Sequence, residues 1–498
     1  MHKLLDKEER NTLTCLEYFS KERTLKTHNI QSMMDELQWT RRSLVKNIDF
    51  LQSEITAQQW ENYLTLHLTA TTIEVELSHL FSIDFFANHY IIQSVPFQFC
   101  LEIFNGDFES LKMFTEKNFL SKPTMYRKIN VLKKVLADFE ITVDLADERR
   151  FIGEEHQIRY FFYCLFSDAY PYTTVFTHSL DIELLNPLME ELIVLHPRMT
   201  YTSVLKIRTF IAITLTRIQQ QHIIDAASSL PTDCDSIILP KKNITTWFSP
   251  SLQTYHLTTD QVDSELNGLH FMLSTLNIYP MSYFETAHVP SFLYDSEFTR
   301  NAETLLMHYC AFFSLALTTN EYSYLLSNLT AINRHMLHVK GSQHNSRIQL
   351  NLEIIGKSHP YIYQACLAFY DYLEKKLTIT LSEPIKIQYF LLLRESLDRL
   401  YPPLTVCVLS KITDAQQAFL KKNIKKLSSV KLVFAQFPDA NVDLYIADFK
   451  IKQLEKRYPE ADFHYWSSIP SEFEWNLLTE TLKECYHQKA FVLPYSQK

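Results

Sequence analysis

The sequence predicts a mainly helical, multidomain protein that ends in a small α/β domain. Apolar residues recur at helical spacing through most of the chain, and only 5 of its 498 residues are glycine. An average soluble protein carries ~7 % glycine, and the tight turns of all-β proteins depend on it. In the last ~95 residues, short strands alternate with helices. At ~100 to 200 residues per domain, the length predicts about three to five domains.

The scarcity of glycine also excludes several kinds of site. The five glycines are too scattered to form a G-x-G-x-x-G motif, a P-loop or a G-x-S-x-G motif, so nucleotide-binding and nucleophile-elbow folds are not expected. Hydrophobic residues make up 46 % of the chain and charged residues 21 %, which favours packing throughout. The glycines are Gly106, Gly153, Gly268, Gly341 and Gly356.

The net charge and the cysteine pattern indicate which binding partners and which cellular compartment to expect. The net charge is -9, so any contact with nucleic acid must come from a local basic patch. The eight cysteines are dispersed without a C-x-x-C pair, which argues against a zinc ribbon or a disulfide framework and favours buried thiols in a reducing cytosol. No signal peptide or membrane span is indicated. We expect a cytoplasmic protein without a metal or a cofactor.

Residues 1–80 are predicted to form a winged helix-turn-helix. Helices over Asp6–Ser20 and Asn29–Leu37 come before Thr40, which is expected to cap a third, amphipathic helix. Alternating apolar residues from Tyr63 to Leu77 predict the hairpin, or wing. The apolar face of the third helix carries Leu44, Ile48, Leu51 and Ile55, and its basic residues are Arg41, Arg42 and Lys46.

Residues 81–153 are predicted to repeat this unit, since the same pattern returns 81 residues later. A helix over 111–118 comes before Ser121, which aligns with Thr40 as the cap, and Ile141–Arg150 predicts the second hairpin. Pro123 stands in the first turn of the capped helix, where its missing N–H costs little. Further aligned pairs are Arg41 and Lys122, Ser43 and Thr124, Leu44 and Met125, Lys46 and Arg127, Ile48 and Ile129, and Leu51 and Leu132.

The second capped helix concentrates positive charge. From Lys122 to Lys134 there are five basic residues and no acidic one, whereas the first 150 residues hold 18 basic and 22 acidic residues. A charge run of this kind can be a solvated helix face, but the cap, turn, wing and repeat favour contact with DNA phosphates and base edges. The candidate DNA-binding residues are Lys122, Thr124, Tyr126, Arg127, Lys128, Lys133 and Lys134, with Arg41, Arg42 and Lys46 in the first unit.

The middle of the chain predicts two helical domains, 154–255 and 256–401. Residues Asp225–Pro250 are interpreted as their connection, because they combine Ser, Asp and Pro. The chain holds 19 histidines, none at metal-ligand spacing. Helices are expected over 155–166, 180–195 and 201–222 in the first domain, and over 261–276, 298–318, 321–338, 361–377 and 385–400 in the second.

This order of units resembles the Mga/AtxA class of virulence regulators, whose helical domains are phosphotransferase-system regulation domains (PRDs). The segments that carry the resemblance most strongly are Phe119–Ile129 and Arg217–Ile224. The resemblance implies a dimeric, DNA-binding transcriptional regulator rather than an enzyme. It also implies HPr or sugar permease components as partners, because these phosphorylate PRD histidines and thereby change dimerisation or activity.

The resemblance also indicates candidate phosphorylated histidines. Residues 155–158 resemble the Asp-His-Ile motif of the first PRD helix, with His156 as the acceptor. In the later Phe-Ile-Ala-Leu-His-Ile-like run, Thr214 stands at the histidine position, which leaves His222 as the second candidate of this domain. In the second PRD, the best match is His270, and weaker matches are His308 and His359.

Residues 402–498 are predicted to form a small parallel α/β domain, which resembles the enzyme IIB domain of this family. An enzyme IIB domain places a nucleophilic cysteine before a glycine-containing phosphate loop. Here Cys407 lies within a strand and the loop Ser410–Asp414 lacks glycine, so we expect a core cysteine in a domain that dimerises or docks. The expected strands are 404–409, 430–437, 442–449 and 463–466, and the expected helices are 415–427 and 473–485.

Two alternatives stay open at this point. The chain could be a phosphotransferase-system component that relays phosphate through histidine and cysteine. It could also be a helical interaction scaffold that binds no DNA.

Overall fold

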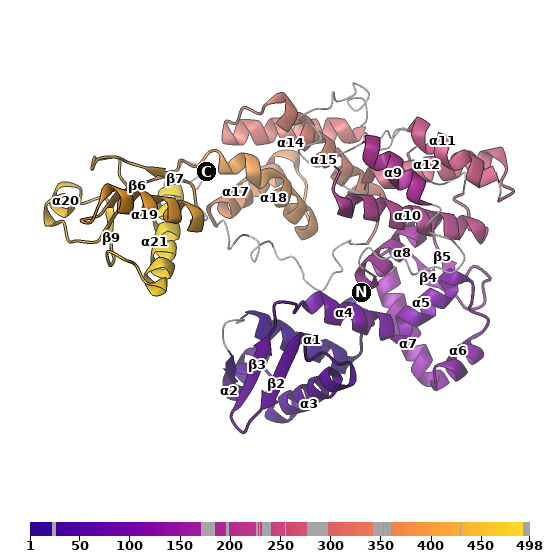
Figure 1. Ribbon diagram of the computed structural model, residues 1–498. Coiled ribbons are helices and arrows are strands. Elements are labelled where there is room, and N and C mark those ends of the chain that lie inside the picture. Colours follow the sequence, from indigo (N-terminus) through magenta and orange to yellow (C-terminus); the bar gives the residue numbers. More distant parts are fainter. Residues whose placement is uncertain are drawn as a thin grey trace. The chain divides into compact units, whose positions relative to one another are not determined.

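The computed structural model describes residues 1–21, 26–170, 185–195, 199–225, 228, 230–231, 241–253, 255–275, 297–341, 352, 356, 360–428 and 430–491. They form a mainly helical, multidomain chain with small sheets, as predicted (Figure 1). The contacts divide the chain into two compact units: Met1–Glu303 with Thr319–Gln349, and Thr304–Thr318 with Leu350–Lys498. The expected division into five domains stays a prediction.

Residues 1–80, hereafter the first repeat, contain the predicted helices and hairpin. A short strand, β1, pairs with β3 and completes a three-stranded sheet in the order β1-β3-β2, with His28 opposite Ile73. The sequence did not indicate β1, because three residues are too few to show alternation. The elements are η1 His2–Leu4, α1 Lys7–Lys21, β1 Thr27–Asn29, α2 Ile30–Leu37, α3 Arg41–Ala57, β2 Leu64–Leu68 and β3 Thr72–Leu77.

Residues 81–153, the second repeat, reproduce the helices around the turn. Both predicted caps are confirmed: the side chain of Thr40 accepts from the N–H of Ser43, and that of Ser121 accepts from the N–H of Thr124, each at 3.2 Å. The elements are α4 Ile83–Gln93, α5 Val95–Asn105, α6 Leu111–Lys117, α7 Lys122–Ala137, β4 Thr142–Val143 and β5 Phe151–Ile152.

The backbone also repeats at the ends of the capped helices. Gln38 and Phe119 come just before the caps and both have left-handed backbone, with φ of 54° and 52°. Gln59 and Glu140 follow the helices and are left-handed too, with φ of 58° and 55°. Each pair is separated by 81 residues, so the spacing found in the sequence is confirmed in the backbone.

A series of helices follows the second repeat, and two expectations about it are wrong. Helix α10 ends at Gln219, so His222 lies beyond the helix instead of ending it. The expected connection over 225–250 contains the start of α11, where Ile244, Phe248 and Leu252 are buried at a spacing of four residues. The helices are α8 Glu155–Ala169, α9 Asn186–Leu195, α10 Tyr201–Gln219, α11 Lys241–Gln253, α12 Thr259–Thr275, α14 Glu297–Phe313, α15 Thr319–His338, α17 Pro360–Leu377 and α18 Glu383–Asp398.

An aromatic cluster attaches the second repeat to α8. Phe162 lies in α8, and its ring centroid is 4.7 Å from that of Phe104 in α5 and 5.1 Å from that of Phe151 in β5. Phe161, also in α8, lies 5.3 Å from Phe139, which follows α7. These rings are all buried, so the second repeat and α8 share one apolar core.

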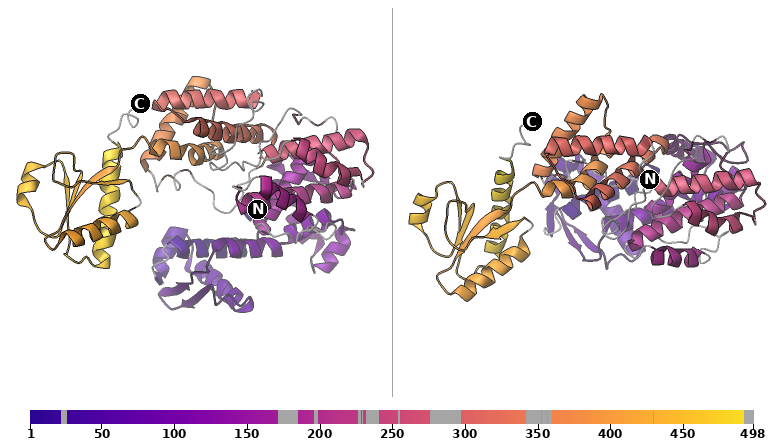
Figure 2. Two further views of the ribbon diagram at one scale, coloured as in Figure 1. Left: turned by 45° about the horizontal axis from the view of Figure 1, so that its top comes forward. Right: turned by 90° about the horizontal axis from the view of Figure 1, so that it is seen from above.

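The C-terminal residues form the predicted parallel sheet. Its strand order is β7-β6-β8-β9, and every neighbouring pair is parallel. Figure 2 shows these strands, in orange and yellow, side by side in both views. The elements are β6 Leu404–Leu409, α19 Asp414–Leu427, β7 Leu432–Phe434, β8 Leu444–Ala447, α20 Lys452–Arg457, β9 Asp462–Tyr465 and α21 Glu472–Phe491. Within the described residues, no helix is both long enough and apolar enough to span a bilayer.

Candidate nucleic-acid interface

Helix α7 turns its apolar side inward and its basic side outward. Met125, Ile129, Leu132 and Leu136 are buried against the second repeat. The structure therefore brings the exposed candidates onto the outer side of one helix, where their charges can meet phosphates. The exposed candidates of α7 are Lys122, Tyr126, Arg127, Lys133 and Lys134.

Thr124 is half-buried and positions its neighbours. Its hydroxyl lies 2.8 Å from that of the cap residue, Ser121, and accepts a hydrogen bond from the Arg127 guanidinium at 3.3 Å. The N-terminal turn of α7 is thus held by local hydrogen bonds, and these place Arg127 near the start of the helix.

Lys128 differs from the other basic residues of α7. It forms an ion pair with Asp6, and only 16 % of its side chain is exposed. Its charge is therefore already engaged, and we expect it to contribute less to DNA binding than the sequence pattern indicated.

The basic candidates of the first repeat are also partly engaged. Arg41 donates to the carbonyl of Ala70 in the turn of the β2–β3 hairpin, and Lys46 forms an ion pair with Glu8 at 2.6 Å. Arg42 is exposed. Since α3 also carries Asp49 and Glu54, its surface has mixed charge, unlike that of α7.

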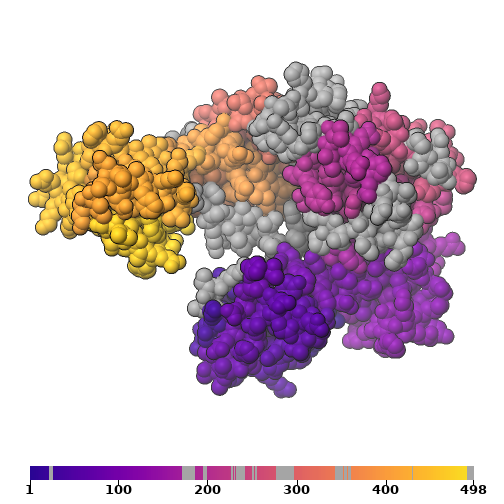
Figure 3. All heavy atoms as spheres, in the orientation of Figure 1, coloured from indigo at the N-terminus to yellow at the C-terminus, as the bar shows by residue number. Residues whose placement is uncertain are grey.

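One short segment supplies both carboxylates that engage the capped helices. Asp6 comes just before α1 and binds α7, whereas Glu8 lies in the first turn of α1 and binds α3. A further ion pair joins Lys3 to Asp138 at 3.0 Å. Figure 3 shows the adjoining surfaces of the two repeats, in indigo and purple.

Phe119, in the turn between α6 and α7, is not among the DNA-binding candidates that the sequence indicated. This residue is 97 % exposed, the largest value among the exposed large apolar residues of the described chain. The 81-residue alignment contained the signal, because the equivalent residue of the first repeat is the polar Gln38.

The candidate histidines lie in different environments. His156 and His270 are buried, and His222 is half-buried beyond the end of α10. Burial lowers the pKa of both His156 and His222 to about 4, so these rings are neutral at pH 7. His308 is half-buried, with its Nδ1 atom 3.1 Å from the Tyr372 hydroxyl, and His359 lies outside the described residues.

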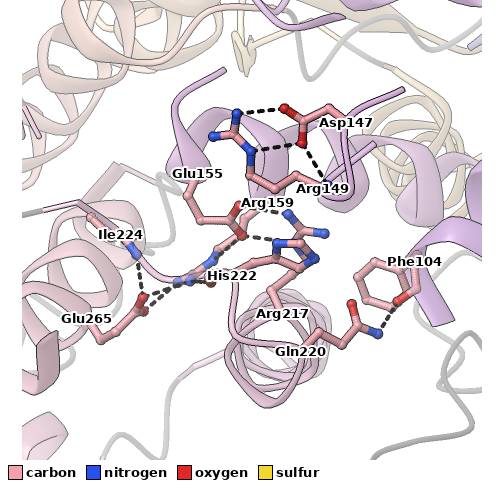
Figure 4. A network of polar contacts seen from close by, with 10 residues as sticks. All are labelled: Phe104, Asp147, Arg149, Glu155, Arg159, Arg217, Gln220, His222, Ile224 and Glu265. Atoms are coloured by element: carbon pink, nitrogen blue, oxygen red, sulfur yellow. Dashed lines mark hydrogen bonds and ion pairs between the residues drawn. The ribbon is translucent and has the colours of Figure 1, made fainter. Parts of the chain in front are cut away.

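A buried network of two glutamates and two arginines lies next to His222 (Figure 4). Arg159 of α8 donates to both carboxylate oxygens of Glu265 in α12, at 2.6 and 2.9 Å, and to the carbonyl of His222 at 2.9 Å. Arg217 of α10 donates to both oxygens of Glu155, at 2.9 and 2.8 Å. Arg159 also donates to Glu155 at 3.0 Å, so the network joins α8, α10 and α12.

The charges of this network compensate one another. Burial opposes ionisation of Glu155, but Arg217 and Arg159 outweigh it and lower the pKa of the Glu155 carboxyl. The side chains of Arg159 and Glu265 are each 1 % exposed, so loss of one partner would leave an unpaired buried charge. The sequence signal was Arg159, the one basic residue other than histidine within the aromatic-rich α8.

The C-terminal domain keeps its cysteine in the core. Cys407 is fully buried in β6 with Val442 and Tyr445, and burial raises the pKa of its thiol. In the loop that follows β6, the Asp448 carboxylate accepts from the N–H of Lys411 at 2.9 Å and from the Ser410 hydroxyl at 3.0 Å. The Asp448 carboxylate thus engages two hydrogen-bond donors of this loop.

The comparisons with known proteins match one part of the chain. Residues 79–166 match the family described as the Mga helix-turn-helix domain, which indicates a DNA-binding transcriptional regulator. The match begins just before α4, includes α7 and extends into α8, on which the second repeat packs. A search of curated proteins finds no match to this chain.

Proposed function

We propose that this protein is a sequence-specific, dimeric transcriptional regulator whose α7 makes the main contact with duplex DNA. The observation that carries the proposal is the exposed group of cations on a capped helix within the Mga-matched residues. Lys122, Arg127, Lys133 and Lys134 neutralise phosphates, and the N-terminal turn of α7 approaches base edges in the major groove.

The test removes two of these cations and measures the salt dependence of binding. The variant combines Lys122→Ala with Arg127→Ala, and its probe is a duplex enriched from random DNA by the wild-type full chain. Because each lost phosphate contact reduces the log–log salt slope by about 0.9, we expect a slope lower by about two and weaker binding.

The matched control is Lys375→Ala with Lys376→Ala, which removes two exposed positive charges from α17. It changes the net charge equally, so it separates a local effect of α7 from a general one. The same affinity and slope in the two double variants would contradict the proposal.

For the dimer, we propose that a second copy covers an apolar stripe near the start of α21. Ile469, Phe473 and Leu477 are spaced by four residues, and all three are exposed. Apolar surface of this kind is typical of interfaces. Phe473→Asp is expected to yield a monomer in sedimentation experiments, whereas Phe419→Asp, an exposed position on α19, leaves the dimer intact.

We further propose that residues 154–255 and 256–401 are PRDs and that His222, which is more exposed than His156 and His270, is phosphorylated. Burial lowers the pKa of this ring most, and the charges of Arg217, Arg159 and Arg149 lower it further, whereas Glu155 raises it. A phosphoryl group adds about two negative charges that these arginines attract. His156 and His270 are buried, so their phosphorylation requires the helices to separate.

Phosphorylated HPr tests this proposal. Wild-type protein is expected to accept the phosphoryl group, and His222→Ala is expected to lose most of it, with His308→Ala as the control. Unchanged labelling of His222→Ala would contradict the assignment.

We propose that the chain is not an enzyme, with the buried Cys407 and the engagement of its loop by Asp448 as support. Rapid onward transfer from the labelled protein to a sugar permease would instead support a phosphorelay component. Absence of any salt-dependent duplex binding would support an interaction scaffold.

A further inference from the structure

Phe119 occupies its position at a cost to folding. It has left-handed backbone, with φ of 52°, a conformation in which the side chain of a bulky residue crowds the backbone. The residue is 97 % exposed, so it gains almost nothing from burial.

The first repeat shows that the turn does not require an aromatic residue. Gln38 stands 81 residues earlier with φ of 54°, and the same cap geometry follows at Thr40. The two turns have the same backbone conformation but different residues, so this conformation does not explain why an aromatic residue stands at position 119. An exposed aromatic residue with this backbone is instead typical of a site that contacts another molecule.

The surroundings of Phe119 indicate what that contact is. The residue comes two positions before the cap Ser121, at the amino end of α7, and the exposed Lys122, Tyr126 and Arg127 follow it on the helix. In helix-turn-helix proteins this end of the recognition helix contacts base edges. The flanking cations favour a polyanion as the partner rather than an apolar protein surface.

We propose that Phe119 is a specificity-determining residue that packs against the 5-methyl group of thymine in the major groove. This methyl group is the one apolar feature of the base edges displayed there, and phenylalanine is among the side chains that contact it. The inference rests on the proposed function, because it places α7 in the major groove.

The test removes the thymine methyl groups from the DNA and leaves its base pairing unchanged. The probe is the duplex enriched from random DNA by the wild-type full chain, compared with the same duplex in which deoxyuridine replaces every thymidine. Wild-type protein is expected to bind the uracil duplex about fourfold more weakly for each contacted methyl group. Phe119→Asn is expected to bind both duplexes equally.

Asparagine is chosen because it tolerates left-handed backbone. Phe119→Asn is therefore expected to keep or raise the midpoint of thermal unfolding. If the variant binds the thymine duplex more weakly than the wild type does, a folding defect then cannot be the cause. The matched control is Gln38→Asn, at the equivalent position of the first repeat, which is expected to keep the full sensitivity to uracil.

The outcomes separate the two proposals. Failure of the full chain to enrich any duplex overturns both the proposed function and the role of Phe119. An enriched duplex that wild-type protein binds equally with thymine and uracil overturns only the role of Phe119. If Phe119→Asn still binds the thymine duplex more tightly than the uracil duplex, the role of Phe119 is also overturned. The same holds if this variant changes its oligomeric size but binds DNA as the wild type does.

Discussion

The first and second repeats share the backbone of their turn and differ in what surrounds it. In both, a left-handed residue precedes a Ser or Thr cap, and an amphipathic helix follows. The first repeat adds a three-stranded sheet of its own. The second has strands of only two residues each and relies on the aromatic side chains of α8.

This difference separates the requirements of folding from those of binding. The cap, the turn and the buried face recur because each satisfies backbone groups or buries apolar area in either repeat. The outward side is free to vary, so α7 carries five cations and no carboxylate while α3 carries both signs of charge. The repeat with the more basic helix shares its aromatic core with α8, which Arg159 joins to α10 and α12.

The largest expected change in stability comes from breaking the buried ion-pair network of α8. Arg159→Met leaves Glu265 buried without its bidentate partner, and we expect a loss of about 3 to 5 kcal/mol in the free energy of unfolding. Denaturant unfolding of the full chain measures this loss. Arg149→Met, which breaks the exposed pair with Asp147, is the control, and a similar loss in both variants would show that the buried network adds no support.

The pH dependence of stability tests the contribution of His156 in α8. The pKa of this ring is about 4 in the folded chain and 6.5 when unfolded, so between these values the unfolded chain binds the additional proton. The free energy of unfolding therefore falls as the pH drops from 6.5 to 4, by up to about 3 kcal/mol from this group. His156→Gln is expected to lose this part of the pH dependence in unfolding experiments. The same dependence of the free energy of unfolding on pH in the wild type and in His156→Gln would contradict this prediction.

Substitution of the two cap residues distinguishes the repeats further, because the effects on stability and on DNA binding should differ. Thr40→Ala and Ser121→Ala are each expected to cost about 1 kcal/mol in stability. Only Ser121→Ala should also weaken DNA binding markedly, since the hydroxyl of Ser121 contacts Thr124, which holds Arg127. Unfolding and duplex-binding measurements on both variants test this. A greater loss of binding in Thr40→Ala would assign the main contact to α3 instead.

The smallest effect is expected from the two carboxylates that engage the capped helices. Asp6→Asn frees Lys128 in α7, and Glu8→Gln frees Lys46 in α3. Each should tighten duplex binding by about threefold or less and make the log–log salt slope steeper by about 0.9. If α7 makes the main contact, Asp6→Asn has the larger effect. Equal effects would show that both helices bind DNA alike.

Much of the fold could be predicted from local patterns. The offset of 81 residues, the caps Thr40 and Ser121, and the parallel C-terminal strands depend on neighbours in the sequence, and all are present. Strand β1 and helix α11 were missed, because the first is too short to show a period and Ser, Asp and Pro obscured the second.

The sequence by itself determined that a capped, basic helix occurs twice and which residues of it are charged. Only the tertiary structure decided which of those charges are free. Lys128 and Lys46 meet carboxylates from the start of the chain, and Arg159 meets Glu265 across 106 residues. The physical reason is range: caps and helical faces depend on groups within a few residues, whereas ion pairing and burial depend on what folding brings together.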